Sequence, residues 1–109
     1  MSVGLFKYDG DLYDRNSKEI LSEPVASERM YMKYLGPAIE ELNIQYFYDG
    51  AWLRKCNLDS IMSELDMLIQ WVEVHVEGID REYFLERLEN MKVVIPRELE
   101  NDDDILYIF

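Results

Sequence analysis

The last nine residues, Asn101-Asp102-Asp103-Asp104-Ile105-Leu106-Tyr107-Ile108-Phe109, join a charged turn to a short and almost wholly apolar segment. We expect residues 105–109 to form a β-strand. An apolar strand of this kind promotes aggregation when its backbone groups are exposed at the edge of a sheet. The strand is therefore predicted to lie inside a sheet, with a neighbouring strand on each side.

Two Asp-Gly pairs indicate further turns, at residues 9–10 and 49–50. Both residues of such a pair tolerate the positive φ of a tight hairpin turn, and aromatic and apolar residues flank each pair. The strands predicted around these turns cover residues 3–8, 11–13, 44–48 and 51–53. The polar residues 14–22 are predicted to form a loop.

The 3.6-residue spacing of apolar side chains predicts helices between these strands. The first helix is expected to begin near Pro24, whose fixed φ suits a first helical turn, and to be interrupted at Gly36-Pro37. The second begins after an Asn57 N-cap and ends at Gly78. Apolar side chains at heptad-like spacing along this second helix are Leu58, Ile61, Leu65, Leu68 and Val72.

A third helix is predicted from an Asp80 N-cap to the residues before Pro96, because proline disfavours the helical conformation in the residue before it. The order of these elements predicts an α+β fold. In this fold a small, mainly antiparallel sheet has about three helices packed on one face. Residues 1–109 are expected to form a single domain.

The charge is strongly acidic: 23 acidic and 11 basic side chains give a formal net charge of −12. This balance argues against binding nucleic acid through its phosphates, which requires clustered lysine and arginine. It also argues against docking on an anionic membrane surface. It favours a basic protein partner, attracted over long range at low salt. A surface that is merely well solvated would carry the same charge.

The residues typical of catalytic and metal sites are scarce. His75 and Cys56 are the only histidine and cysteine, and one of each cannot form a tetrahedral zinc site. The acidic segment that starts at Asp9 fails the EF-hand spacing, since Asp14 stands where glycine is required. The sequence contains no phosphate-binding loop, dinucleotide fingerprint or nucleophile elbow. We therefore expect no enzyme activity, no catalytic residue, no metal and no cofactor.

A cytoplasmic location is predicted. A single cysteine excludes an internal disulfide, and residues 1–7 lack the basic and apolar regions of a signal peptide. No apolar run approaches the roughly 18 residues that a transmembrane helix needs. We expect no membrane association.

Aromatic residues are numerous, with eight tyrosines, two tryptophans and four phenylalanines. Tyrosine and tryptophan give a large contact area at small entropic cost and dominate interface hot spots. Packing of a sheet that is covered on both sides would use aromatic residues equally well. The predicted partner-binding residues are Tyr46, Tyr48, Asp49 and Trp52 of the second hairpin, with Asp102, Asp103 and Asp104 as an electrostatic rim.

The short chain, its charge, the turns Tyr8-Asp9-Gly10 and Tyr48-Asp49-Gly50, and the acidic-then-apolar residues 102–109 together have a recognisable character. The profile resembles the small acidic immunity proteins that bacteria pair with secreted or contact-delivered toxins. The resemblance implies a tight one-to-one complex that blocks a toxin, often a basic nuclease, by covering its active site or an adjacent surface. It transfers no individual residue roles.

The sequence thus favours a non-catalytic binding protein, an immunity-type inhibitor of a basic toxin. A DNA-mimic inhibitor is a variant of this hypothesis and would need carboxylates spaced like phosphates. The alternative is an acidic secretion-type chaperone or a homo-oligomeric assembly subunit. In that case the apolar stripe of the second helix would form a dimer seam. The free protein is accordingly expected to be a monomer or a dimer.

Overall fold

The computed structural model describes residues 2–10 and 13–109. Its α+β fold, as predicted, contains one antiparallel sheet with the strand order β2-β1-β4-β3. The strands are β1 (Ser2–Tyr8), β2 (Glu19–Ser27), β3 (Trp52–Arg54) and β4 (Ile105–Ile108). The helical elements are α1 (Glu28–Met30), a π-helical turn η1 (Tyr31–Leu35), α2 (Gly36–Leu42), a 3-10 turn η2 (Lys55–Asn57), α3 (Leu58–His75) and α4 (Gly78–Glu98).

The C-terminal strand β4 lies inside the sheet, which confirms its predicted place. On one side Leu5 of β1 pairs with Ile108, and on the other Trp52 of β3 pairs with Tyr107. The ladder extends past the strand end, because Phe109 and Gly4 exchange two backbone hydrogen bonds of 2.8 and 3.1 Å. The apolar terminal segment is therefore paired on both sides rather than exposed at an edge.

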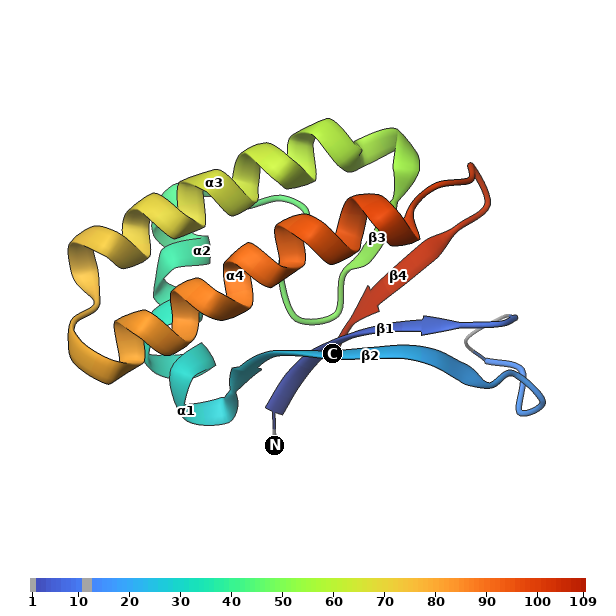
Figure 1. Cartoon of the computed structure of the whole chain (residues 1–109), viewed down its shortest axis with the longest axis horizontal. Helices are drawn as coiled ribbons and strands as arrows, with labels where there is room; N and C mark the ends of the chain where they lie inside the picture. Colours follow the sequence, from blue (N-terminus) through green and yellow to red (C-terminus); the bar gives the residue numbers. More distant parts are fainter. Residues whose placement is uncertain (1, 11–12) are drawn as a thin grey trace.

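Helices α3 and α4 run antiparallel and lie together on one side of the sheet (Figure 1). The core forms between these two layers, where Leu5, Leu53 and Leu106 are fully buried. Four of the five stripe residues of α3 are buried in the same core: Ile61, Leu65, Leu68 and Val72. Each Å² of apolar surface removed from water stabilises the fold by about 25 cal/mol, so this packing is the main stabilising contribution. The stripe is occupied within the chain itself, so it does not supply the dimer seam considered above.

The connection between β1 and β2 is longer than the predicted two-residue turn. It spans residues 9–18, and two hydrogen bonds between Asp9 and Lys18 close it. The Asp9 N–H donates to the Lys18 carbonyl oxygen (2.9 Å), and the Lys18 N–H donates to Asp9 Oδ1 (2.6 Å). Tyr13 of the predicted strand 11–13 is not in a strand, and residues 11–12 lie outside the described part of the chain.

Strand β2 occupies residues predicted as loop and as the start of a helix. It runs through Pro24, which has no N–H to donate. Proline is tolerated here because β2 is an edge strand, where a backbone position that faces solvent needs no donor. The helix begins instead after Ser27, whose side chain accepts a 3.2 Å hydrogen bond from the Met30 N–H as an N-cap. The predicted irregularity near Pro37 is present as the π-helical turn η1, in which the Gly36 N–H donates to the Tyr31 carbonyl.

The predicted strand 44–48 is absent, because a buried carboxylate takes up the backbone donors of this segment. Glu64 of α3 accepts hydrogen bonds from the N–H groups of Gln45 (2.6 Å), Tyr46 (3.0 Å) and Phe47 (3.1 Å). The segment therefore forms an irregular loop with Phe47 fully buried. The predicted turn at Asp49-Gly50 is present, with φ of +96° at Gly50.

The boundaries of the two long helices differ from the predictions by a few residues. Asn57 precedes α3 as expected, but its side chain makes no capping hydrogen bond to the helix. Helix α3 ends at His75, before Gly78. Helix α4 begins at Gly78 rather than after Asp80, and it continues through Pro96 to Glu98. Proline so close to the end of a helix removes only one late backbone hydrogen bond.

Candidate partner-binding face

The face of the sheet opposite α3 and α4 carries a row of aromatic side chains. Phe6 of β1 and Trp52 of β3 both pair with Tyr107 of β4, so the three side chains lie side by side across the strands. Tyr8 and Phe109 follow on the same face, because each lies two residues from its neighbour in the row and side chains alternate along an extended chain; Phe109 stands just past the end of β4, where it still pairs with Gly4. We call Phe6, Tyr8, Trp52, Tyr107 and Phe109 the aromatic face. No helix in the described part of the chain covers it (Figure 1).

The rings of the aromatic face contact one another directly. Trp52 and Tyr107 lie nearly perpendicular, with ring centroids 5.1 Å apart, and Tyr8 contacts Tyr107 at 5.8 Å. Phe6 and Phe109 are stacked at 4.7 Å. Edge-to-face and offset-stacked pairs of this kind contribute about 0.5–1.5 kcal/mol each beyond their buried area. The face is therefore a pre-organised surface on which Trp52 and Phe109 stay 43% and 45% exposed, whereas the central Tyr107 is buried.

A groove of about 580 Å³ opens beside the aromatic face. Tyr8, Trp52 and Tyr107 contribute to it together with Tyr13, which contacts Trp52 at a centroid distance of 6.1 Å. The β1–β2 connection and the loop before β4 border the groove, and both project at the same end of the molecule (Figure 1). The remaining lining residues are Lys7, Asp9, Gly10, Ile20, Asp103, Asp104 and Ile105. We call this cavity the acidic groove.

The lining of the acidic groove has an excess of negative charge. Three carboxylates, of Asp9, Asp103 and Asp104, stand against one ammonium group, that of Lys7. Lys7 is itself engaged, because its Nζ donates to the Glu98 carbonyl oxygen at 2.9 Å and lies 3.3 Å from Asp104 Oδ1. The exposed aromatic rings could stack on nucleic-acid bases, but single-strand binding also needs a positively charged groove. The groove instead favours a cationic group.

Asp104 has a structural role in the loop before β4. Its Oδ2 accepts a 2.8 Å hydrogen bond from the Asn101 N–H, and its own N–H donates to the Asn101 carbonyl oxygen at 3.1 Å. The Asn101 N–H and the Lys7 ammonium hold the pKa of Asp104 below its usual range. Asp104 therefore stays ionised and fixes the loop that carries Asp102 and Asp103.

The seven predicted interface residues separate into two groups. Trp52, Asp103 and Asp104 line the acidic groove. Asp102, in the same loop as Asp103, has a fully exposed carboxylate that lies 4.0 Å from Nζ of Lys55 in η2. The other three residues lie in the loop that Glu64 holds, and none of them lines this groove: Tyr46, Tyr48 and Asp49.

Those three residues differ in exposure. Tyr46 is half-buried against the core, whereas Tyr48 is 41% exposed in the turn. Asp49 lines a separate cavity of about 430 Å³ beside Phe109, and its N–H donates to the Tyr31 hydroxyl at 3.0 Å.

The sequence did not predict a binding role for four residues of the aromatic face, nor the buried carboxylate of Glu64. The four are Phe6, Tyr8, Tyr107 and Phe109. The alternation of Phe6 and Tyr8 with Lys7 in β1 was the available signal for the face, because it places both rings on one side of a strand. Glu64 gives no comparable signal, since helical periodicity alone does not show that a loop will present three N–H groups to it.

The two residues with catalytic potential lie apart from the acidic groove. His75 is exposed, stacks on Trp71 at 4.4 Å and places Nδ1 3.0 Å from the Trp71 carbonyl oxygen. Cys56 is exposed in η2, with its Sγ 3.5 Å from Asn57 Oδ1. Among the described residues, no group of three or more His, Cys, Asp or Glu side chains is arranged to hold a metal ion.

Comparison of the chain with protein-family models, with curated proteins and with solved structures finds no match. Within residues 2–10 and 13–109, no helix combines the length and the apolar character needed to cross a lipid bilayer.

Proposed function

We propose that this chain is a non-catalytic binding protein that engages a basic protein through the aromatic face and the acidic groove. The observation that carries the proposal is the row of aromatic rings on the sheet face that no described helix covers, with Trp52 and Phe109 exposed, next to an excess of carboxylates. Aromatic anchors at the centre of an interface with charged groups at its rim are the usual arrangement of binding hot spots. In the form that the sequence predicts, the partner is a basic toxin, and the complex blocks its activity.

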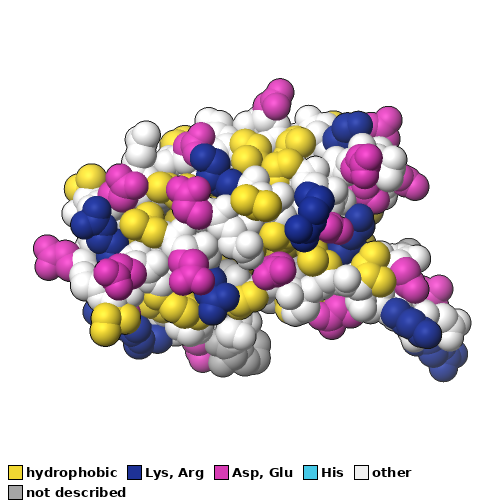
Figure 2. Space-filling view, in the orientation of Figure 1, with side chains coloured by type: hydrophobic (Ala, Val, Ile, Leu, Met, Phe, Trp, Pro, Cys, Tyr) yellow, Lys and Arg dark blue, Asp and Glu magenta, His cyan; other side chains and the backbone are white. Residues whose placement is uncertain are grey.

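The charge distribution supports a directed encounter. Acidic side chains are spread between basic and apolar ones on the side seen in Figure 2, and they do not gather in one patch there. Asp102 and Asp103, in contrast, lie in a projecting loop at the border of the acidic groove. Carboxylates at the rim of an interface raise the association rate of a basic partner, and salt screens this effect. This spread also disfavours a DNA mimic, which needs an ordered row of charges.

The first experiment is co-expression with the product of the adjacent gene, purification through a tag on this chain, and measurement of binding at low and high salt. We expect a one-to-one complex that weakens with salt and silences a toxic or nucleolytic activity. Recovery of this chain alone, with no basic protein retained at either salt concentration, would refute the proposal.

Matched variants then locate the binding surface. Trp52→Ala should raise the Kd by about 30-fold, mainly through faster dissociation, since loss of a hot-spot side chain costs about 2 kcal/mol or more. Tyr83→Ala is its control, because Tyr83 is a similarly exposed aromatic residue (38%) on α4. Equal effects of the two substitutions would place the interface elsewhere.

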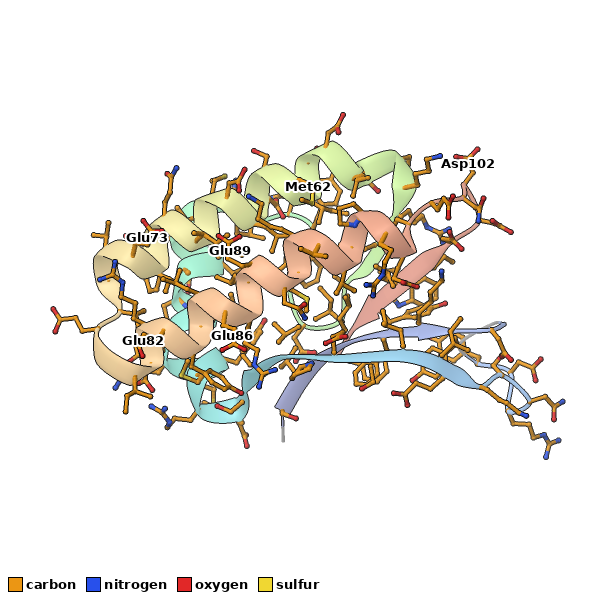
Figure 3. All side chains as sticks on the ribbon, viewed as in Figure 1. Met62, Glu73, Glu82, Glu86, Glu89 and Asp102 are labelled. Atoms are coloured by element: carbon orange, nitrogen blue, oxygen red, sulfur yellow. The ribbon has the colours of Figure 1, made fainter. Side chains whose placement is uncertain are left out.

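The rim is tested separately with Asp102→Asn/Asp103→Asn. This double variant should slow association several-fold at low salt and have little effect at high salt. Glu82→Gln/Glu86→Gln removes the same charge from α4, near the opposite end of the molecule from Asp102 (Figure 3). Association rates that fall equally in both double variants would show an effect of net charge alone.

A further inference from the structure

The aromatic rings of the acidic groove meet at angles that suit a flat cation. The Trp52 and Tyr107 planes are inclined at 82°, and the Tyr13 plane is inclined at 44° to that of Trp52. A group placed against the exposed Trp52 ring can therefore stack on that ring while the exposed Tyr13 ring lies beside it, and the buried Tyr107 supports Trp52. The faces of aromatic rings are negative in their quadrupole, so such a corner attracts a cation.

Two carboxylates of the groove keep free acceptor capacity. Asp104 is committed to the Asn101 N–H and to Lys7, as described above. Among the described residues, Asp9 accepts one side-chain hydrogen bond, from the Lys18 N–H to Oδ1, and its second oxygen accepts none. Asp103 is exposed and makes no hydrogen bond or ion pair with the residues that the structure describes. The groove thus combines aromatic surfaces with two carboxylates that can each accept further donors.

We propose that the acidic groove binds the guanidinium group of an arginine side chain presented by the basic partner. This inference rests on the proposed function and names the group that is recognised. Guanidinium is planar, stacks on aromatic faces and presents five donors in a fixed fork that matches a carboxylate. A lysine ammonium is a compact, strongly hydrated point charge and uses the flat ring surfaces less well. The groove volume of about 580 Å³ leaves room for the side chain and for adjacent backbone.

The probe is N-acetyl-arginine amide, titrated into the full chain and followed by the two tryptophan indole N–H signals in an NMR spectrum. N-acetyl-citrulline amide has nearly the same shape without the charge, and N-acetyl-lysine amide has the charge without the planar fork. We expect the Trp52 signal to shift with the arginine probe. The apparent Kd should be about tenfold higher for the citrulline and lysine probes. Trp71 serves as an internal control, because it lies on α3 and is bonded to Glu41 and stacked on His75.

Two single substitutions connect the shift to the groove. Asp103→Asn should weaken arginine binding several-fold while leaving the fold intact, because Asp103 has no partner to lose among the described residues. Tyr13→Ala should have a similar effect, since Tyr13 is 80% exposed and flanks Trp52. Glu89→Gln on α4 is the charge-matched control and should bind as the wild type does.

The outcomes separate this inference from the proposed function. Equal shifts for arginine, lysine and citrulline, equal shifts at Trp52 and Trp71, or no shift at all would each overturn the arginine site. A basic partner that still binds in a Trp52-dependent manner would then leave the proposed function standing. Arginine binding that depends on Asp103, in a chain that retains no basic protein, would instead support the groove and refute the proposed partner.

Discussion

The carboxylate of Glu64 holds the loop that leads into β3, and its removal should destabilise the protein more than any exposed charge. It is 8% exposed and is the acceptor for three consecutive backbone N–H groups. Glu64→Ala deletes all three hydrogen bonds at once. Glu64→Gln keeps one acceptor oxygen but turns an amide NH₂ group toward donors that need an acceptor.

The magnitude follows from what each N–H group can do after the substitution. The Phe47 N–H lies in the buried interior and is left unsatisfied, which costs about 1–3 kcal/mol. The N–H groups of Gln45 and Tyr46 are partly exposed, so water replaces most of the lost interaction and each costs about 0.5–1 kcal/mol. The carboxylate no longer has to be desolvated, and this offsets part of the loss. We expect about 3 kcal/mol for Glu64→Ala and about 2 kcal/mol for Glu64→Gln.

Chemical denaturation followed by circular dichroism measures these changes. For a domain of this size, 3 kcal/mol corresponds to a decrease in Tm of about 12 °C. Glu73→Ala is the matched control, because Glu73 is an exposed glutamate on the same helix (Figure 3), and it should change the unfolding free energy by less than about 0.5 kcal/mol. A Glu64→Ala protein as stable as the Glu73→Ala protein would refute the assignment of Glu64 as the anchor of this loop.

Two further predictions concern the sheet and the contact between α1 and α4. Gly4→Ala places a Cβ 2.9 Å from two carbons of the Phe6 ring. It should lower the unfolding free energy by about 1 kcal/mol and change the near-ultraviolet circular dichroism, and an unchanged spectrum would contradict it. Hydrogen bonds from Arg29 and Tyr34 hold the pKa of Asp80 below its ordinary value of 3.8, so the stability they give is present above that pH and is lost below it. Asp80→Asn should therefore be less stable than the wild type at pH 7, and denaturant titrations should show the difference shrinking below pH 3.8; a constant difference would count against the ion pair.

The fold class follows from the periodicity of apolar residues in the sequence, and the interior place of β4 follows from its almost wholly apolar composition. The stripe of α3 repeats over several turns, and the terminal apolar strand can avoid an exposed edge only between two neighbours. Residues 44–48 show the limit of the same reasoning. They have the aromatic and β-branched composition of a strand, but Glu64 takes the backbone donors that a strand would use. That competition depends on a residue 17 to 19 positions away and leaves no local pattern.

The candidate site could be predicted only in part, because local sequence identifies single residues but not which residues the sheet brings together. Trp52 and Asp103 were recognisable as an aromatic residue after a turn and an exposed carboxylate before a strand. Their proximity to Tyr8 is a consequence of strand order, because β1 and β3 both pair with β4, and Tyr13 contacts Trp52 from the β1–β2 connection. The two Asp-Gly pairs predict two tight turns, but only the pair at 49–50 forms one, and the pair at 9–10 begins the longer connection that borders the groove.

The three successive carboxylates before β4 illustrate why the interface and the fold must be tested with different substitutions. Asp104 closes its own loop and pairs with Lys7, so Asp104→Asn should lower stability and displace the whole loop. Asp103 makes no such contact with the described residues, and Asp102 forms only an exposed ion pair with Lys55 at 4.0 Å, which contributes little to stability. Their exchange should therefore alter association while the unfolding free energy changes little. A triple substitution would slow binding for two reasons at once and could not separate them. If Asp102→Asn/Asp103→Asn slows association while the unfolding free energy is unchanged, the acidic loop acts through its charge. If association is unchanged, the charge of the loop has no role in binding.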